Sequence, residues 1–467
     1  MASVVEKGGL PPTDNATQVL PDNTDIEEAA ANVDGDTQAR DRLDKLKKDY
    51  GSTWNGPNNP NDPYNWSSFR KIGIGVIFSF WQLVTLMSAS MIAAALGDIE
   101  RDLNVDASTA QIIFSTYFLG LAFAPFLIAA VAEMNGRKGV WVFGNPWYIL
   151  WNARCPVGNS KGLMIVGRLM TGAGASAGIT WQWIFWIMCI FNTAITLLGV
   201  VFIRESYTPV LLRRKARAQH GPADTPWNRL FWRDLLSRLS VNFRRPYLLL
   251  ARRPVIQVIA LIMALNFGIY CFMLSTFATL WIDLYGQSTT TSSLNYIVGT
   301  TVWAQVGGHI MDLIYLRLRD RAGGTGGRPE FRVPWMAPGV AMLAAGLFWY
   351  GWSAEQLAAW ASVDAGAAVF ACGSFVVGQA LLAYQLDEFT GHGASANAAS
   401  RVLSNLLGFA FPVFAPALYG RLGYGWGNSL LGFVWVALVG PAPVLLWFWG
   451  GRLRALGRKP GEGAGGA

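Results

Sequence analysis

The sequence predicts an all-α, polytopic membrane protein, and three observations support this fold class. Apolar residues make up 52% of the 467 positions and charged residues only 14%, against about 25% charged residues in soluble domains. Eleven apolar runs lie between residues 72 and 450, each close to the roughly 20 residues that a helix needs to cross a bilayer. The four cysteines and three histidines match no metal-ligand spacing, which argues against a zinc enzyme or a disulfide scaffold and predicts neither metal nor cofactor.

The first 70 residues predict a solvated tail. Residues 1–69 hold 12 acidic and 6 basic residues and end in a run rich in Pro and Asn at 55–63. A segment of this composition cannot bury enough apolar surface to fold. We therefore expect residues 1–70 to form a disordered, cytosolic N-terminal tail.

The apolar runs predict the membrane spans that follow. The third span is the weakest, because Asn145-Pro146 interrupts it and Arg154 ends it early. We expect spans near 72–96, 108–132, 139–156, 162–180, 181–203, 255–281, 290–316, 335–353, 363–384, 399–420 and 427–450.

The distribution of charge predicts the orientation of these spans. Segment 204–253 carries 12 Lys and Arg against 3 acids, and 317–334 carries five Arg, whereas the loop 97–107 has four acids and one Arg. Basic segments stay in the cytosol, so we expect a basic cytosolic linker at 204–253 and an external acidic loop at 97–107. A C-terminal bundle at 254–451 and a cytosolic tail at 452–467 follow. This topology accounts for the net charge of +8 without nucleic acid.

In the N-terminal bundle, at 71–203, the predicted spans do not keep every basic segment in the cytosol. Starting inside, four spans return the chain to the cytosol near residue 180, and the fifth would then deliver the basic linker to the outside. The bundle is therefore one crossing short. If 181–203 exits to the cytosol, an earlier span must fail to cross, and we expect it to be 139–156.

Several strings along the chain resemble the twelve-helix major facilitator superfamily, specifically its fungal drug:proton antiporter branch. They lie at 62–66, 132–138, 168–177, 204–215, 327–334, 348–352, 411–416 and 423–429. The resemblance implies two helical bundles that rock about a mid-membrane cavity, in a monomeric protein of the plasma membrane with both termini cytosolic. It also implies small-molecule substrates and protons as partners.

One departure from this family is large. In relatives, a basic loop and a fifth helix with a Gly/Pro-rich antiporter motif follow the fourth helix. Here Gly178-Ile-Thr180 runs directly into Trp181-Gln-Trp-Ile-Phe-Trp186, which resembles the entrance of the sixth helix. Roughly fifty residues of the family pattern are absent, as a shortened isoform or a mispredicted exon boundary would produce.

A gating function is predicted for Glu133, Gly136, Arg137 and Lys138, after the second span. Glycine permits a left-handed backbone in a tight turn, and a Glu–Arg pair can lock neighbouring helices in one state. The alternative is simple positive-inside flanking.

Two further charged residues are candidates for gating or coupling. Arg168 lies inside an apolar span, where arginine is costly and usually functional, and the resemblance implies proton coupling; alternatively its side chain reaches the membrane face near Lys161. Asp312 echoes the N-terminal motif, as internal repeats predict. Its alternative role is an interfacial salt bridge to Arg317 or Arg319.

Four polar residues at mid-span depth are candidates for lining the substrate cavity. Polar groups in lipid must be paired or must line a wet cavity, and interhelical hydrogen bonding is the alternative. These residues are Asn266, Tyr270, Gln305 and Asn405.

The chain has no nucleophile–base constellation and no phosphate-binding loop, so we expect a transporter rather than an enzyme. The preferred hypothesis is proton-coupled efflux of small organic molecules. Two alternatives stay open: a transport-inactive shortened form, and proton-coupled uptake of a polyamine or nutrient.

Overall fold

In the computed structural model, the described residues are 43–155 except 45, 49–51 and 57–58, then 181–220, 237, 247–248, 250–286, 310–322, 328–389 and 393–456. They contain helices and no strand, which confirms the all-α class. The predicted span 162–180, with Arg168, and most of 290–316, with Gln305, lie outside them. The chain divides into two units: residues 1–66 with 208–223, and the remainder.

The smaller unit joins part of the predicted tail to α8 (Thr208–His220) and includes the short η1 (Pro63–Asn65). The Lys215 ammonium donates to the Thr53 carbonyl oxygen and to Asn55 Oδ1, both at 2.7 Å. It also lies 6.0 Å from the ring centre of Trp54, which is buried. The stretch around Trp54 therefore packs on the basic linker, although its composition predicts a solvated tail.

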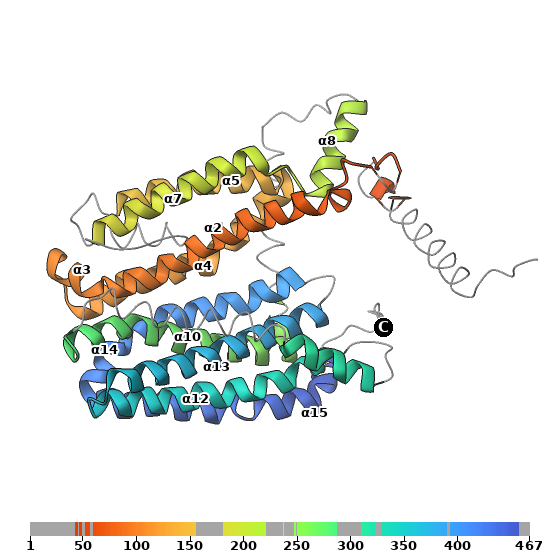
Figure 1. Ribbon diagram of the computed structural model, residues 1–467. Coiled ribbons are helices and arrows are strands. Elements are labelled where there is room, and N and C mark those ends of the chain that lie inside the picture. The colour runs from red at the N-terminus through yellow and green to blue at the C-terminus, as the bar shows by residue number, and fades with distance from the viewer. Residues whose placement is uncertain are drawn as a thin grey trace, which may run out of the picture. The chain divides into compact units, whose positions relative to one another are not determined.

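The N-terminal helices of the larger unit are α2 (Ser68–Ala94), α3 (Leu96–Leu103), α4 (Ala107–Asn135), α5 (Arg137–Arg154) and α7 (Trp181–Phe202). In Figure 1, the axes of α2, α4, α5 and α7 run roughly parallel to one another. The acidic segment 97–107 is mostly helical, because Leu96 and Ile99 are buried beneath its charged face. Asp106 caps α4 by accepting hydrogen bonds from the Thr109 N–H (3.2 Å) and hydroxyl (2.6 Å).

α5 continues through Pro146 to Arg154 and runs antiparallel to α7. Asn152, near its end, contacts Cys189 in the first half of α7, while Trp141, near its start, lies against Gly199. The expectation that Asn145-Pro146 interrupts this span is wrong. Proline removes a single backbone hydrogen bond, and the turns on both sides of Pro146 remain helical.

The C-terminal helices are α10 (Pro254–Asp283), a helical stretch at 310–321, η2 (Pro329–Arg332), α12 (Val333–Glu355), α13 (Trp360–Glu388), α14 (Gly393–Val439) and α15 (Ala442–Ala455). Buried apolar side chains of α10 and α12–α15 form one continuous core. α14 contains two helices that meet at Gly423, whose φ is +71°, so the predicted spans 399–420 and 427–450 are separate.

Five helical segments among the described residues are long and apolar enough to cross a membrane. The segment Ala396–Ala455 has 60 residues, which exceeds one crossing at 1.5 Å per residue and divides at Gly423. Gln111 on α4 donates to the Ser275 carbonyl oxygen on α10 (3.4 Å), and Phe118 packs edge-on against Phe267 at 5.4 Å. The result is a polytopic helical protein.

Candidate functional site

The turn between α4 and α5 is built on Gly136. Its φ is +97°, a conformation that side-chain-bearing residues rarely adopt. A Cβ atom at this position would also overlap the Glu205 carboxylate. Both the backbone and the close approach of Glu205 therefore require glycine, in agreement with the left-handed turn that the sequence predicts.

Glu205 binds the first turn of α5 through both carboxylate oxygens. Oε1 accepts from the Arg137 N–H and Oε2 from the Lys138 N–H, each at 3.0 Å. Oε1 also accepts from the Tyr207 N–H at 2.9 Å. These α5 N–H groups have no partner inside their helix, and a negative charge there is favoured by the helix dipole.

The two basic side chains of the turn reach residues at and after the end of α7. Lys138 Nζ donates to the Val200 carbonyl oxygen at 3.1 Å. The Arg137 guanidinium lies 5.2 Å from the ring centre of Tyr207. We call Gly136, Arg137, Lys138 and Glu205 the turn clamp, because together they fasten the start of α5 to the end of α7.

Glu133, the carboxylate that the sequence analysis favours for this site, lies on α4 one turn before Gly136, and its side chain is outside the described part. Sequence reasoning missed Glu205. Its signal is visible afterwards: Glu205 is the single acidic residue in the basic stretch 204–223.

A second site gathers six charged side chains at the ends of four helical elements, and we call it the C-terminal charge cluster. Arg332, the last residue of η2, pairs with Asp312 at 2.7 Å and with Asp387 at 3.0 Å. Its guanidinium also lies 4.1 Å from the ring centre of Tyr315. Asp312 thus forms a salt bridge, as the alternative interpretation of this residue holds, but its partner is Arg332 on another element and not Arg317 or Arg319.

The other half of the cluster centres on Arg454, in the last turn of α15. Arg454 binds Glu330 through Nε (2.9 Å) and Nη2 (3.0 Å), and Glu388 through Nη1 (3.0 Å). The Glu388 and Glu330 side chains are 4% and 10% exposed. Four carboxylates thus share two guanidinium groups, so the cluster carries an excess of negative charge. Its Glu330 and Glu388 half is buried, whereas the Asp312 and Asp387 side chains are 64% and 30% exposed.

The described cavity candidates lie within helix packing. Asn266 Nδ2 on α10 donates to the Ser374 carbonyl oxygen on α13 at 3.0 Å, which is the interhelical alternative. Tyr270 stacks on Phe267 with ring centres 6.2 Å apart. Asn405 is buried on α14. Among the described residues, no three His, Cys, Asp or Glu side chains could hold a metal ion together.

Comparison with curated proteins finds fungal transporters. The chain is 35% identical to a probable efflux pump, mfs2, of Aspergillus flavus, with 78% of the chain and 98% of the relative covered. It is 30% identical to the efflux pump vrtL of Penicillium aethiopicum, with 87% and 90% covered. It is 31% identical to the MFS-type transporter oryF of Aspergillus oryzae, with 84% and 92% covered.

Each alignment has more positions than the number of residues of this chain that it includes, so some positions are filled only by the relative. The alignment with the A. flavus protein has 420 positions, while 78% of 467 residues is about 364 residues. About 56 positions therefore have no residue in this chain, and the same reasoning gives about 53 for the P. aethiopicum protein. The chain lacks roughly fifty residues that its relatives possess, as the sequence analysis predicts.

Solved structures show the same fold. The xylose transporter XylE from E. coli, in a partially occluded inward-open conformation, is 12% identical with a TM-score of 0.55, over 80% of this chain and 98% of that one. A bacterial homologue of the human lysosomal transporter Spinster is 11% identical with a TM-score of 0.55, over 85% and 100%. The family model described as Major Facilitator Superfamily matches residues 78–180 and 175–412. The chain belongs to the major facilitator superfamily.

Proposed function

We propose that this protein is a secondary active transporter that exports small organic molecules (drugs, toxins or secondary metabolites) in exchange for protons. The observation that carries the proposal is the 30–35% identity to fungal efflux pumps over most of both chains. We further propose that it works as a monomer without catalytic activity, in the plasma membrane, with both termini cytosolic.

The two charged sites supply the gates of this mechanism. In alternating access, two bundles rock about a central cavity, and contacts at one face must hold in one state and release in the other. The turn clamp would supply such a contact in the N-terminal bundle, and the C-terminal charge cluster would supply it in the C-terminal bundle. The expected functions of Glu133, Arg168 and Asp312 belong to the same proposal, with Asn266, Tyr270, Gln305 and Asn405 near the cavity.

The excess of carboxylates supports proton coupling. Four carboxylates compete for two guanidinium groups, so one carboxylate can bind a proton while each arginine keeps a partner. Protonation of that carboxylate would break its ion pair, weaken the cluster and release the gate.

Transport in an efflux-deficient yeast strain tests the proposal. Cells loaded with a panel of amphipathic dyes at acidic external pH should lose dye faster with the transporter than with an Arg168→Ala control. A protonophore should abolish the difference. Dye loss that persists without the proton gradient would contradict proton coupling, and net accumulation would favour the uptake alternative.

A second candidate function, that of a transport-inactive shortened form, is favoured by the missing positions and by the division of the family match at 175–180. The same assay should include a version in which a relative's loop and fifth helix are restored between Thr180 and Trp181. Under this second function, the restored form transports and the 467-residue form does not. Equal dye loss from both at equal membrane abundance would contradict the shortened-form hypothesis.

A further inference from the structure

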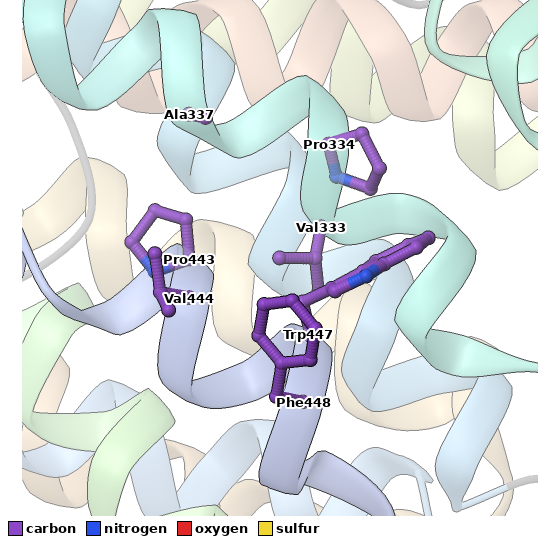
Figure 2. A pocket seen from close by; sticks show the side chains of 7 residues that line it. All are labelled: Val333, Pro334, Ala337, Pro443, Val444, Trp447 and Phe448. Atoms are coloured by element: carbon purple, nitrogen blue, oxygen red, sulfur yellow. The ribbon is translucent and has the colours of Figure 1, made fainter.

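An outward-facing apolar groove lies between the start of α12 and α15. It encloses about 190 Å³. Figure 2 shows Val333, Pro334 and Ala337 on one wall and Val444, Trp447 and Phe448 on the other. The Val444, Trp447 and Phe448 side chains are 60%, 38% and 72% exposed. The groove is therefore open to the outside of the protein, where a membrane protein contacts lipid chains.

The groove results from short side chains between large ones. Pro334 and Pro443 stand near the starts of α12 and α15, where proline is tolerated. Their compact rings and the Ala337 methyl group leave unfilled the space that the Trp447 and Phe448 rings border (Figure 2). The apolar lining of this groove suits an extended hydrocarbon chain better than a polar ligand.

Two exposed arginines flank the groove residues along the chain. Arg328 directly precedes η2, which leads into Val333, and Arg452 follows Phe448 by about one turn of α15. Both are exposed, and neither forms an ion pair with a described residue. Their neighbours Arg332 and Arg454 differ, because each is held by two carboxylates.

We propose that this groove binds a phospholipid with an anionic head group. One acyl chain lies along the apolar walls, and Arg328 and Arg452 bind the head-group phosphate. Guanidinium groups bind phosphate through paired, charge-assisted hydrogen bonds. The basic segments 317–334 and 452–459 predict that this end faces the cytosol, the leaflet in which anionic lipids are concentrated. The proposal depends on membrane insertion alone and not on the transport direction.

Lipid retention by the purified full chain tests the proposal. The protein in neutral detergent is equilibrated with equal amounts of phosphatidylglycerol and phosphatidylcholine of matched chain length, and bound lipid is counted by native mass spectrometry. We expect the wild type to prefer phosphatidylglycerol. Arg328→Gln and Arg452→Gln should each lower that preference about fivefold, and added salt should lower it as well.

Two further variants separate the groove from general surface charge. Arg421→Gln removes an exposed arginine near Gly423, where the two helices of α14 join and contact the C-terminus of α12, and should leave the preference unchanged. Ala337→Trp fills the groove from an exposed position and should reduce retention of both lipids. Equal retention of the two lipids by the wild type, an equal loss in Arg421→Gln, or unchanged retention in a monodisperse Ala337→Trp protein would each overturn the proposal.

Discussion

Replacing Glu205 with Gln should loosen the turn clamp without unfolding the bundle. The carboxylate binds two backbone N–H groups of α5 and the Tyr207 N–H. Glutamine retains one acceptor oxygen, but its NH₂ group would face the other N–H as a second donor. The negative charge at the helix N-terminus is lost as well.

The size of the effect follows from these contacts. A hydrogen bond to a charged group contributes about 1.5–3 kcal/mol, and the helix-dipole interaction about 0.3–1 kcal/mol. Glu205 is half-buried, so screening by solvent reduces the sum to about 1–2 kcal/mol. Hydrogen exchange of a peptide covering Arg137 and Lys138 should therefore speed up about 5- to 30-fold.

Glu355→Gln is the matched control for this measurement. Glu355 accepts a hydrogen bond from the Gly425 N–H at 3.1 Å, and its carboxylate lies close to Gly423, which also has a positive φ. This variant should speed exchange near Gly425 and leave the α5 peptide unchanged. Unchanged exchange at Arg137 and Lys138 in Glu205→Gln, or equal acceleration there in both variants, would refute the clamp.

Three other predictions concern single residues. Arg454→Ala should lower the free energy of unfolding by about 3–5 kcal/mol, because the carboxylate of Glu330, whose side chain is 10% exposed, loses the guanidinium that pairs with it; a melting temperature equal to the wild type would contradict this. Asn192→Leu should stabilise the protein by about 1–3 kcal/mol, because neither side-chain polar atom of this buried amide has a hydrogen-bond partner among the described residues; a lower melting temperature would count against it. Arg168→Lys should keep part of the proton-dependent efflux of the junction-restored form and Arg168→Ala none, at unchanged surface expression, and normal efflux by the Ala variant would exclude a coupling function.

The helices could be predicted where a long apolar run determines them. The predicted span 255–281 corresponds to α10 (Pro254–Asp283), and 363–384 lies inside α13 (Trp360–Glu388). Length and hydropathy suffice here, because an apolar segment of this size forms its backbone hydrogen bonds within one helix in lipid. α3 was missed because eight residues with four charges are too short and too polar for that signal.

The partners within the candidate sites could not be predicted. Asp312 pairs with Arg332, 20 residues away, rather than with the nearer Arg317 or Arg319. Glu205 binds residues 67 and 68 positions earlier. Helical periodicity relates residues three or four apart, so it identifies neighbours on one helix and carries no information about which helix ends meet. The motif strings contained most of these residues without indicating their contacts.

The turn clamp also bears on the missing crossing. Glu205, just after α7, binds the start of α5, so α7 ends at the face where α5 begins. Because α7 runs antiparallel to α5 and has 22 residues, about 33 Å, Trp181 starts at the face where α5 ends. The chain at Cys155 and at Trp181 is therefore at the same face of the membrane.

An even number of crossings must then connect Cys155 to Trp181. Residues 156–180, outside the described part, provide 25 positions, whereas two crossings require about 40. If α5 crosses the membrane, the deficit lies after it, which agrees with the predicted loss at the junction of Thr180 and Trp181. Adding the roughly fifty positions that the relatives possess gives about 75 residues, enough for two helices of about 20 and a cytosolic loop between them. Charge, chain length and the turn clamp therefore favour one absent helix between Cys155 and Trp181, and the alignments account for about the number of residues that this helix and its loop require.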